Sequence, residues 1–195
     1  PRSTPKPSSA ASDVYKRQAF IIVPRLVLYI EKRAILLIAI AFAALVPPIP
    51  IILFINGILP ESGSWNLFYS LVPFIYIANT CLSSSAIIRE SMLGDISDEV
   101  ELDSKIGQQG LMFASSSLIG KLNTGFGILV AGIALELIGF PQGSEVAPNA
   151  DQIFSLAMVQ GPLVAILMII PFGIFSTYKI NRKRHEYIIS QLELR

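Results

Sequence analysis

The stretch AILLIAIAFAALVPPIPIILFINGIL, residues 34–59, is 26 residues long and carries no charged side chain. About 20 consecutive apolar residues are enough for a helix to cross the hydrocarbon core of a bilayer. The stretch therefore predicts a membrane-spanning helix. Pro47, Pro48 and Pro50 lie in its second half, and proline kinks a helix because it removes backbone donors.

Three further apolar segments are long enough to span, at 67–88, 110–138 and 152–178, and of these 110–138 contains two charged residues. Residues 19–30 are apolar but too short to span, and they contain Arg25, so we expect the end of a truncated helix there. Only 15% of the 195 residues are charged, against about 25% in soluble domains. This deficit argues against a disordered chain, a nucleic-acid-binding protein and an ordinary soluble enzyme. No enzyme motif is found, and the single Cys81 cannot form a disulfide within the chain.

Residues 1–18, PRSTPKPSSAASDVYKRQ, differ sharply in composition from the rest and resemble a translated adapter segment. We interpret them as non-native and leave them out of the reasoning on fold and function. The first residue is Pro1 and not Met, so we expect the sequence to be a piece of a larger protein.

The distribution of basic residues predicts the orientation of the four spans. Cytoplasmic loops are enriched in Lys and Arg. The loops 60–66 and 139–151 contain neither, whereas the turn before 34, the stretch 89–109 and the tail 179–195 contain both. We therefore expect a cytoplasmic C-terminus in a bacterial-type inner or plasma membrane.

Lys121 is the first candidate functional residue, because it lies eleven residues into the segment 110–138, roughly 16 Å from its start. A lysine inside a membrane span costs about 2.5–3.5 kcal/mol on insertion scales and commonly marks a substrate or ion path. Ser117 and Thr124 share its helix face. An alternative is that Lys121 extends its amine to the membrane surface.

The stretch 89–109 is predicted to be an acidic cytoplasmic loop. Asp95, Asp98 and Glu101 recur every three residues, so they could also lie along one side of a helix that continues into the cytoplasm. Either a solvated loop or a salt-bridged gate to another segment would account for them. The pattern lacks the glycine of an EF-hand loop, and we expect no metal site.

Residues 91–140 resemble the glycoside–pentoside–hexuronide:cation symporters, the melibiose-permease-like branch of the major facilitator superfamily. The family pattern is roughly A-D-x-x-D-x-x-E-x-x-T-G-x-R-x-E-G, followed by a helix with a lysine. Asp95, Asp98, Glu101, Gly110 and Lys121 stand on it. The chain departs from this pattern, so the loop's Arg and Glu charge partners are absent and the sequence looks like that of a divergent subgroup. The departures are at Gly94, Ser104, Lys105, Gly107 and Gln109.

The resemblance implies an all-α integral membrane fold, with the last four helices and part of a fifth of a twelve-helix transporter. It implies cation-coupled symport of a sugar or related small solute by alternating access. Lys121 and Ser117 would line the substrate and cation cavity, and Thr124 shares their helix face. The main ligands of a coupling Na+ or H+ would lie in the N-terminal half. No other cofactor is expected.

The expected partners are the solute, the coupling cation, the lipid bilayer and the N-terminal helices of the same protein, without nucleic acid. A self-contained four-span scaffold or subunit is an alternative. An integral membrane enzyme is disfavoured, because Lys121 and Glu136 are the two charged residues in the spans and lie about 22 Å apart along one helix.

Overall fold

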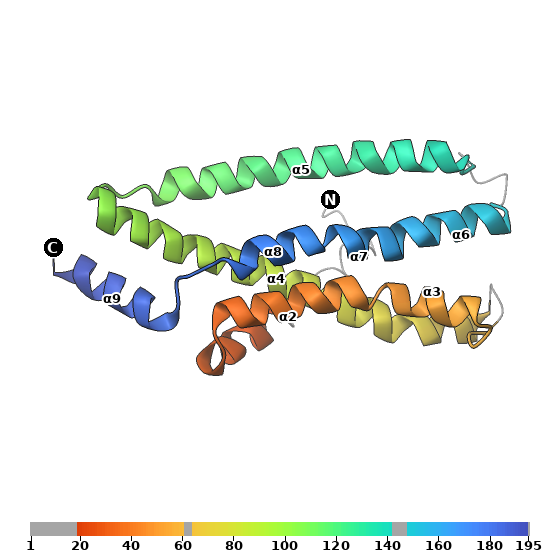
Figure 1. The fold of residues 1–195 in the computed structure, drawn as a ribbon, viewed down its shortest axis with the longest axis horizontal. Helices are drawn as coiled ribbons and strands as arrows, with labels where there is room; N and C mark the ends of the chain where they lie inside the picture. Colours follow the sequence, from red (N-terminus) through yellow and green to blue (C-terminus); the bar gives the residue numbers. More distant parts are fainter. Residues whose placement is uncertain (1–18, 61–63, 142–147, 195) are drawn as a thin grey trace, which may run out of the picture.

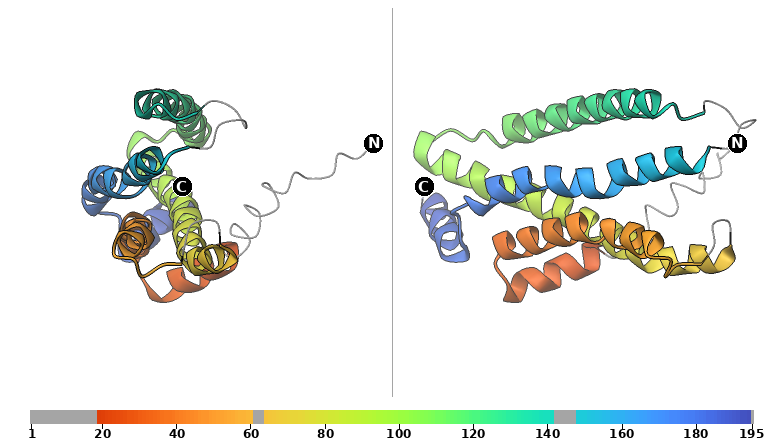
Figure 2. Two further views of the ribbon diagram at one scale, coloured as in Figure 1. Left: turned by 90° about the vertical axis from the view of Figure 1, so that its right-hand side faces the viewer. Right: turned by 45° about the vertical axis from the view of Figure 1, so that its right-hand side comes forward.

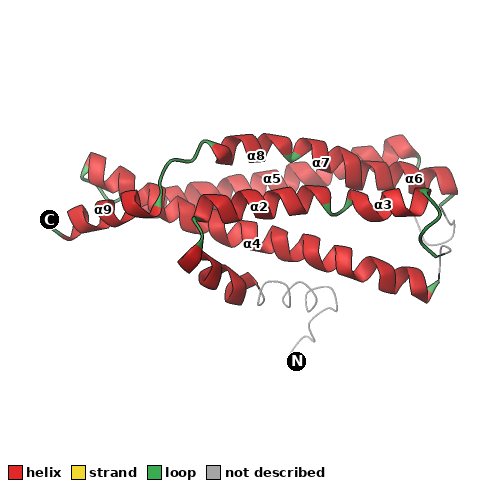
Figure 3. Cartoon of the chain, turned by 60° about the horizontal axis from the view of Figure 1, so that its bottom comes forward, coloured by secondary structure: helices red, strands yellow, loops and turns green. Residues whose placement is uncertain are grey.

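The structure is a computed structural model that describes residues 19–60, 64–141 and 148–194. This part of the chain is helical, without a β-strand (Figure 3). A short helix, Ala19–Tyr29, precedes the helices labelled in Figure 1. Their bounds are α2 Lys32–Leu45, α3 Pro48–Ile55, α4 Trp65–Ser104, α5 Gln109–Ile138, α6 Ala150–Met158, the π-helical turn η1 Val159–Leu163, α7 Val164–Leu167, α8 Ile169–Ser176 and α9 Arg182–Glu193.

Four helical segments are long and apolar enough to cross a membrane, which confirms the predicted all-α membrane fold. They are Lys32–Ile55, Trp65–Ser104, Gln109–Ile138 and Asp151–Ser176. The chain is therefore an integral membrane protein.

Prolines break the first and last spans. The first divides into α2 and α3 at Val46 and Pro47, where the following prolines cannot donate to the preceding turn. The last contains the π-helical turn η1 around Pro162, a local widening that proline commonly accompanies in membrane helices. The two breaks face each other, since a Cβ added to Gly161 in η1 would lie 2.3 Å from Cδ1 of Ile51 in α3.

Polar residues define the ends of the helices. The Ser64 side chain caps α4 by accepting from the backbone N–H of Leu67 at 3.2 Å. α4 ends at Lys105, which adopts a left-handed conformation with φ of 61°. Gly139 ends α5 in the same region of φ, where glycine carries no Cβ penalty. Asn149 and Gln152 form a capping box at the start of α6.

The acidic stretch is a helix over most of its length and not a loop. α4 continues without interruption from the apolar segment through residues 89–104. The extension is held in place because Ile88, Met92 and Asp95 on one side of it are buried. The three-residue spacing of the acidic side chains allowed either a loop or a helix, and the structure contains the helix. The basic tail likewise contains a helix, α9, capped by Asn181.

The buried core lies at the end of the bundle where the short N-terminal helix, α2 and α4 meet. Its largest members are Leu36 and Ile88, both fully buried, and Met92 lies beside them. In contrast, α5 has no buried residue and lies at the edge of the bundle, farthest from the N-terminal helix (Figure 2). Most of its surface is thus uncovered by the other described residues.

Candidate functional site

Asp95 is the centre of a charged network that joins four segments of the chain. Its side chain is 7% exposed and accepts two hydrogen bonds from Lys32 Nζ, at 2.7 Å to Oδ1 and 2.8 Å to Oδ2. The Tyr178 hydroxyl donates to Oδ2 at 3.2 Å, and His185 Nδ1 lies 3.5 Å from Oδ1. The start of α2, the extension of α4, the end of the last span and α9 therefore meet at one carboxylate. We call this end of the bundle the charged end.

Asp95 lies close to a tyrosine hydroxyl and a histidine ring. Burial, with a further contribution from the Asp95 carboxylate, raises the pKa of Tyr178 above its usual range, so the phenol stays a hydrogen-bond donor near neutral pH. His185 Nδ1 is buried and has no hydrogen-bond partner among the described residues. Its contact with Asp95 is therefore a charge contact whose strength depends on whether the imidazole is protonated.

The other predicted acidic residues lie further along α4, toward the turn that leads to α5. Asp98 Oδ1 accepts from Gln109 Nε2 at 3.0 Å, which links α4 to the start of α5. Glu101 lies against Gly107, where an added Cβ would come within 3.4 Å of its Oε2. The predicted gate residues therefore fall into two groups. Asp95 forms hydrogen bonds with distant segments of the bundle, whereas Asp98 forms a hydrogen bond across the α4–α5 turn.

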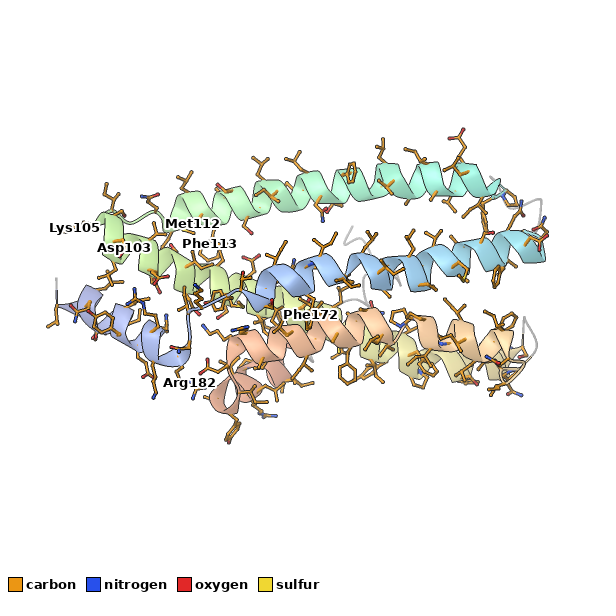
Figure 4. All side chains as sticks on the ribbon, viewed as in Figure 1. Asp103, Lys105, Met112, Phe113, Phe172 and Arg182 are labelled. Atoms are coloured by element: carbon orange, nitrogen blue, oxygen red, sulfur yellow. The ribbon has the colours of Figure 1, made fainter. Side chains whose placement is uncertain are left out.

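The basic tail contacts the same end of the bundle. Arg184 forms an ion pair with Glu99 Oε1 at 3.0 Å and lies over the Tyr187 ring. The Arg182 guanidinium donates to the carbonyls of Val27 and Leu28 at the end of the N-terminal helix. Figure 4 shows Arg182 at the start of α9. A cleft of about 380 Å³ remains between these segments, lined in part by Glu31, Lys32, Asp95, Arg182 and His185.

The predicted cavity residues lie on α5, away from the Asp95 network. Ser117, Lys121 and Thr124 are all exposed, and Lys121 makes no hydrogen bond or ion pair within the described part of the chain. Thr124 Oγ1 donates to the backbone carbonyl of Gly120 at 2.9 Å. The opposite side of α5 faces α4 and α8, where residues that include Ser116 and Asn123 line a groove of about 740 Å³. Lys121 therefore points away from the other described helices.

Lys121 lies near the position along its helix that the sequence predicted, which was roughly 16 Å from the start of the segment 110–138. Lys121 lies about 18 Å from the start of α5 and about 26 Å from its end at Ile138. Because α4 extends about 14 Å beyond Asp95 before the turn, α5 also begins beyond the level of Asp95. Lys121 is therefore closer to the charged end than to the opposite end of its span.

Comparison with known proteins identifies the family. The family described as MFS/sugar transport protein matches residues 18–182. The chain belongs to this family. It is also similar to an uncharacterized symporter of the cyanobacterium Synechocystis sp., with 27% identity over 141 residues that cover 70% of this chain. The chain spans about a quarter of that relative, since the match covers 25% of its length. No solved structure matches the chain.

Family membership confirms the resemblance that residues 91–140 indicated and the expectation of a transport protein instead of an enzyme. For this MFS chain, the sequence did not predict the partners of Asp95. Lys32, Tyr178 and His185 lie 63, 83 and 90 residues from it, and their pairing depends on how the helices pack. A usable signal was present, because Lys32 and Tyr178 each stand at the end of an apolar segment on the side predicted to be cytoplasmic.

Proposed function

We propose that the whole protein is a secondary transporter that carries a sugar or related small solute together with a cation, Na+ or H+, by alternating access. Membership of the MFS/sugar transport protein family supports the transport of small solutes. The similar protein from Synechocystis is named a symporter, which supports cation coupling. The proposed location is a bacterial-type inner or plasma membrane, with the charged end and the C-terminus in the cytoplasm.

The observation that carries the proposal is the position of Lys121. A membrane lysine is stable when it faces water, a carboxylate or a polar ligand. In the described part of the chain it has no such partner, and it projects from the uncovered face of α5 with Ser117 and Thr124. We infer that this face lines the central cavity and that Lys121 binds a solute oxygen or pairs with a carboxylate of the rest of the protein.

The Asp95 network is the proposed cytoplasmic gate. It is located where spans end, and it joins segments far apart in the chain through short polar contacts. Alternating access requires contacts at one end of the bundle that form in one state and open in the other. Asp95 would provide such a contact directly. Asp98 and Glu101 would support the α4–α5 turn beside it.

Uptake by the full-length protein tests the role of Lys121. We expect Lys121→Ala to lower the initial rate of radiolabelled sugar uptake into proteoliposomes with an imposed Na+ or H+ gradient. The reduction should be roughly tenfold to a hundredfold, the value of a lost hydrogen bond to a charged group. Lys121→Arg keeps the charge and should retain part of the rate.

The matched control is Lys183→Ala, which removes an exposed lysine from α9, away from the membrane spans. Its uptake should equal that of the unmodified protein. If Lys121→Ala left both the rate and its gradient dependence unchanged, the cavity role of Lys121 would be wrong. If no sugar or related solute were carried under any gradient, the transport proposal itself would fail.

A further inference from the structure

An apolar groove runs between α2 and the last span, on a different side of the bundle from the Lys121 face. It has a volume of about 360 Å³, and every residue that lines it is apolar. Ala41 and Ala44 of α2 make one wall, and Phe172 belongs to the α8 side (Figure 4). Leu45 and Ile169 at its edges are each 67% exposed. The groove is therefore a shallow apolar channel on the surface of the described bundle.

Two unpaired cations stand at the charged ends of the two segments that form this groove. Lys32 and Tyr178 both bond to Asp95, which brings the charged ends of α2 and of the last span to the same level. Arg33 and Lys179 are the next residues on these segments. Both are exposed, and neither forms an ion pair with a described residue.

The nearby acidic groups are already engaged. Asp95 accepts from Lys32 and Tyr178, and Glu31 accepts from the backbone N–H of Arg182 at 3.2 Å. The exposed Glu186 on α9 lines the cleft beside Asp95. Arg33 and Lys179 are consequently left to interact with a negative group from outside the described chain.

The spacing along the helices matches an amphipathic ligand. Ala41 and Ala44 follow Arg33 by eight and eleven residues, which places all three on one side of α2. The apolar wall begins at Ile40, about 10 Å below Arg33 along α2, and Phe172 precedes Lys179 by seven residues. A phospholipid has the same order of groups, with a phosphate, a short glycerol segment and then an acyl chain.

We propose that this groove is a binding site for an anionic phospholipid of the leaflet next to the charged end. One acyl chain lies along Ala41, Ala44 and Phe172, and the headgroup contacts Arg33 and Lys179. Each basic residue near an anionic membrane surface contributes about a fivefold factor in affinity. The pair therefore selects anionic over zwitterionic lipid, while the groove fixes where the chain lies.

Photo-crosslinking tests the site in the full-length protein. Phe172 is replaced by p-benzoylphenylalanine, and the protein is reconstituted in vesicles of phosphatidylcholine and phosphatidylglycerol at a 3:1 ratio. Lipid adducts are then quantified by mass spectrometry after illumination. We expect phosphatidylglycerol adducts to exceed their share of the vesicle lipid by about tenfold or more. Combined Arg33→Gln and Lys179→Gln substitutions should remove that enrichment, and Ala44→Leu should lower adducts of both lipids.

Lys183→Gln is the matched control, because it removes one exposed cation from α9 without touching the groove, and it should leave the enrichment unchanged. Adducts in proportion to vesicle composition would overturn the proposal, and so would equal effects of the control and the double variant. Crosslinks to a peptide of the same protein would show that another helix fills the groove. Because solute uptake is not measured, these outcomes are independent of the transport proposal.

Discussion

At the scale of single residues, Asp95 is a buried carboxylate that is held by partners from distant segments of the chain. A buried carboxylate without compensation would lose several kcal/mol of hydration. Here two hydrogen bonds from Lys32 and one from Tyr178 replace water. The bridge therefore stabilises the packing of α2 against α4 only as long as both charges are present.

We predict that Asp95→Asn destabilises the protein by about 3 kcal/mol, because it leaves Lys32 partly buried without a counter-charge. Lys32 is 24% exposed, so water relieves some of the penalty. The loss is measured as a lower melting temperature of the detergent-solubilised full-length protein. Replacing both residues, as Lys32→Met with Asp95→Leu, should recover part of the loss because no charge is left unpaired.

Asp98→Asn is the control for this measurement, since Asp98 takes part in an exposed hydrogen bond to Gln109. Its effect should stay within about 0.5 kcal/mol. Equal melting temperatures for Asp95→Asn and Asp98→Asn would contradict the central role of Asp95.

The sequence predicted which residues at this end are unusual, but not what they contact. The spacing of Asp95, Asp98 and Glu101 and the isolated charge of Lys121 are visible in any reading of the chain. That Asp95 turns inward while Lys121 faces away follows from packing across more than 60 residues of sequence, and local pattern carries no such information.

At the scale of elements, the lengths of the apolar segments predicted the four spans. The polar composition of the acidic stretch predicted a loop, which is wrong over most of its length. Six of the residues in 89–109 are acidic, and this composition favours a loop over the helical alternative that the three-residue spacing also allows. Helix formation depends instead on backbone propensity and on burial of one face. Met92 and Asp95 supply that face. The π-helical turn at η1 was also beyond prediction, since Pro162 signals a break but does not determine its form.

The contact between α3 and η1 yields a prediction about element packing. Gly161→Ala should destabilise the protein by about 1–3 kcal/mol, because its Cβ would overlap Cδ1 of Ile51 and crowd the backbone of Pro48. In an Ile51→Val background that methyl group is gone, so the same substitution should cost less. A double-mutant cycle of melting temperatures measures this coupling.

Gly173→Ala is the matched control, as no atom lies within 4 Å of an added Cβ there. Alanine should raise stability at this helical position by up to about 1 kcal/mol. If Gly161→Ala behaved like Gly173→Ala, the two broken helices would not pack as closely as described.

At the scale of the whole molecule, the described bundle is asymmetric. The N-terminal helix, α2 and α4 share a buried core, whereas α5 buries no residue at all against the described chain. Apolar residues such as Leu122 and Phe126, both 65% exposed, surround Lys121 on this helix. Lipid could cover the apolar residues, but a lysine, a serine and a threonine on one face are better suited to a polar lumen. The two sides of α5 should therefore respond differently to a transported solute.

We predict that a cysteine at Thr124 reacts with a charged, membrane-impermeant thiol reagent in the full-length protein and that solute protects it. The substitution is made with Cys81→Ser, which removes the free thiol of this chain. Solute at ten times its half-saturating concentration should slow the reaction about tenfold, because it occupies the cavity that Thr124 lines. Asn123→Cys, which is turned about 100° around α5 from Thr124 and lines the groove with α4 and α8, should show no such protection. Equal protection at both positions would indicate a general conformational change, and an unreactive Thr124→Cys would place this face against lipid; either result contradicts a solute cavity at Lys121.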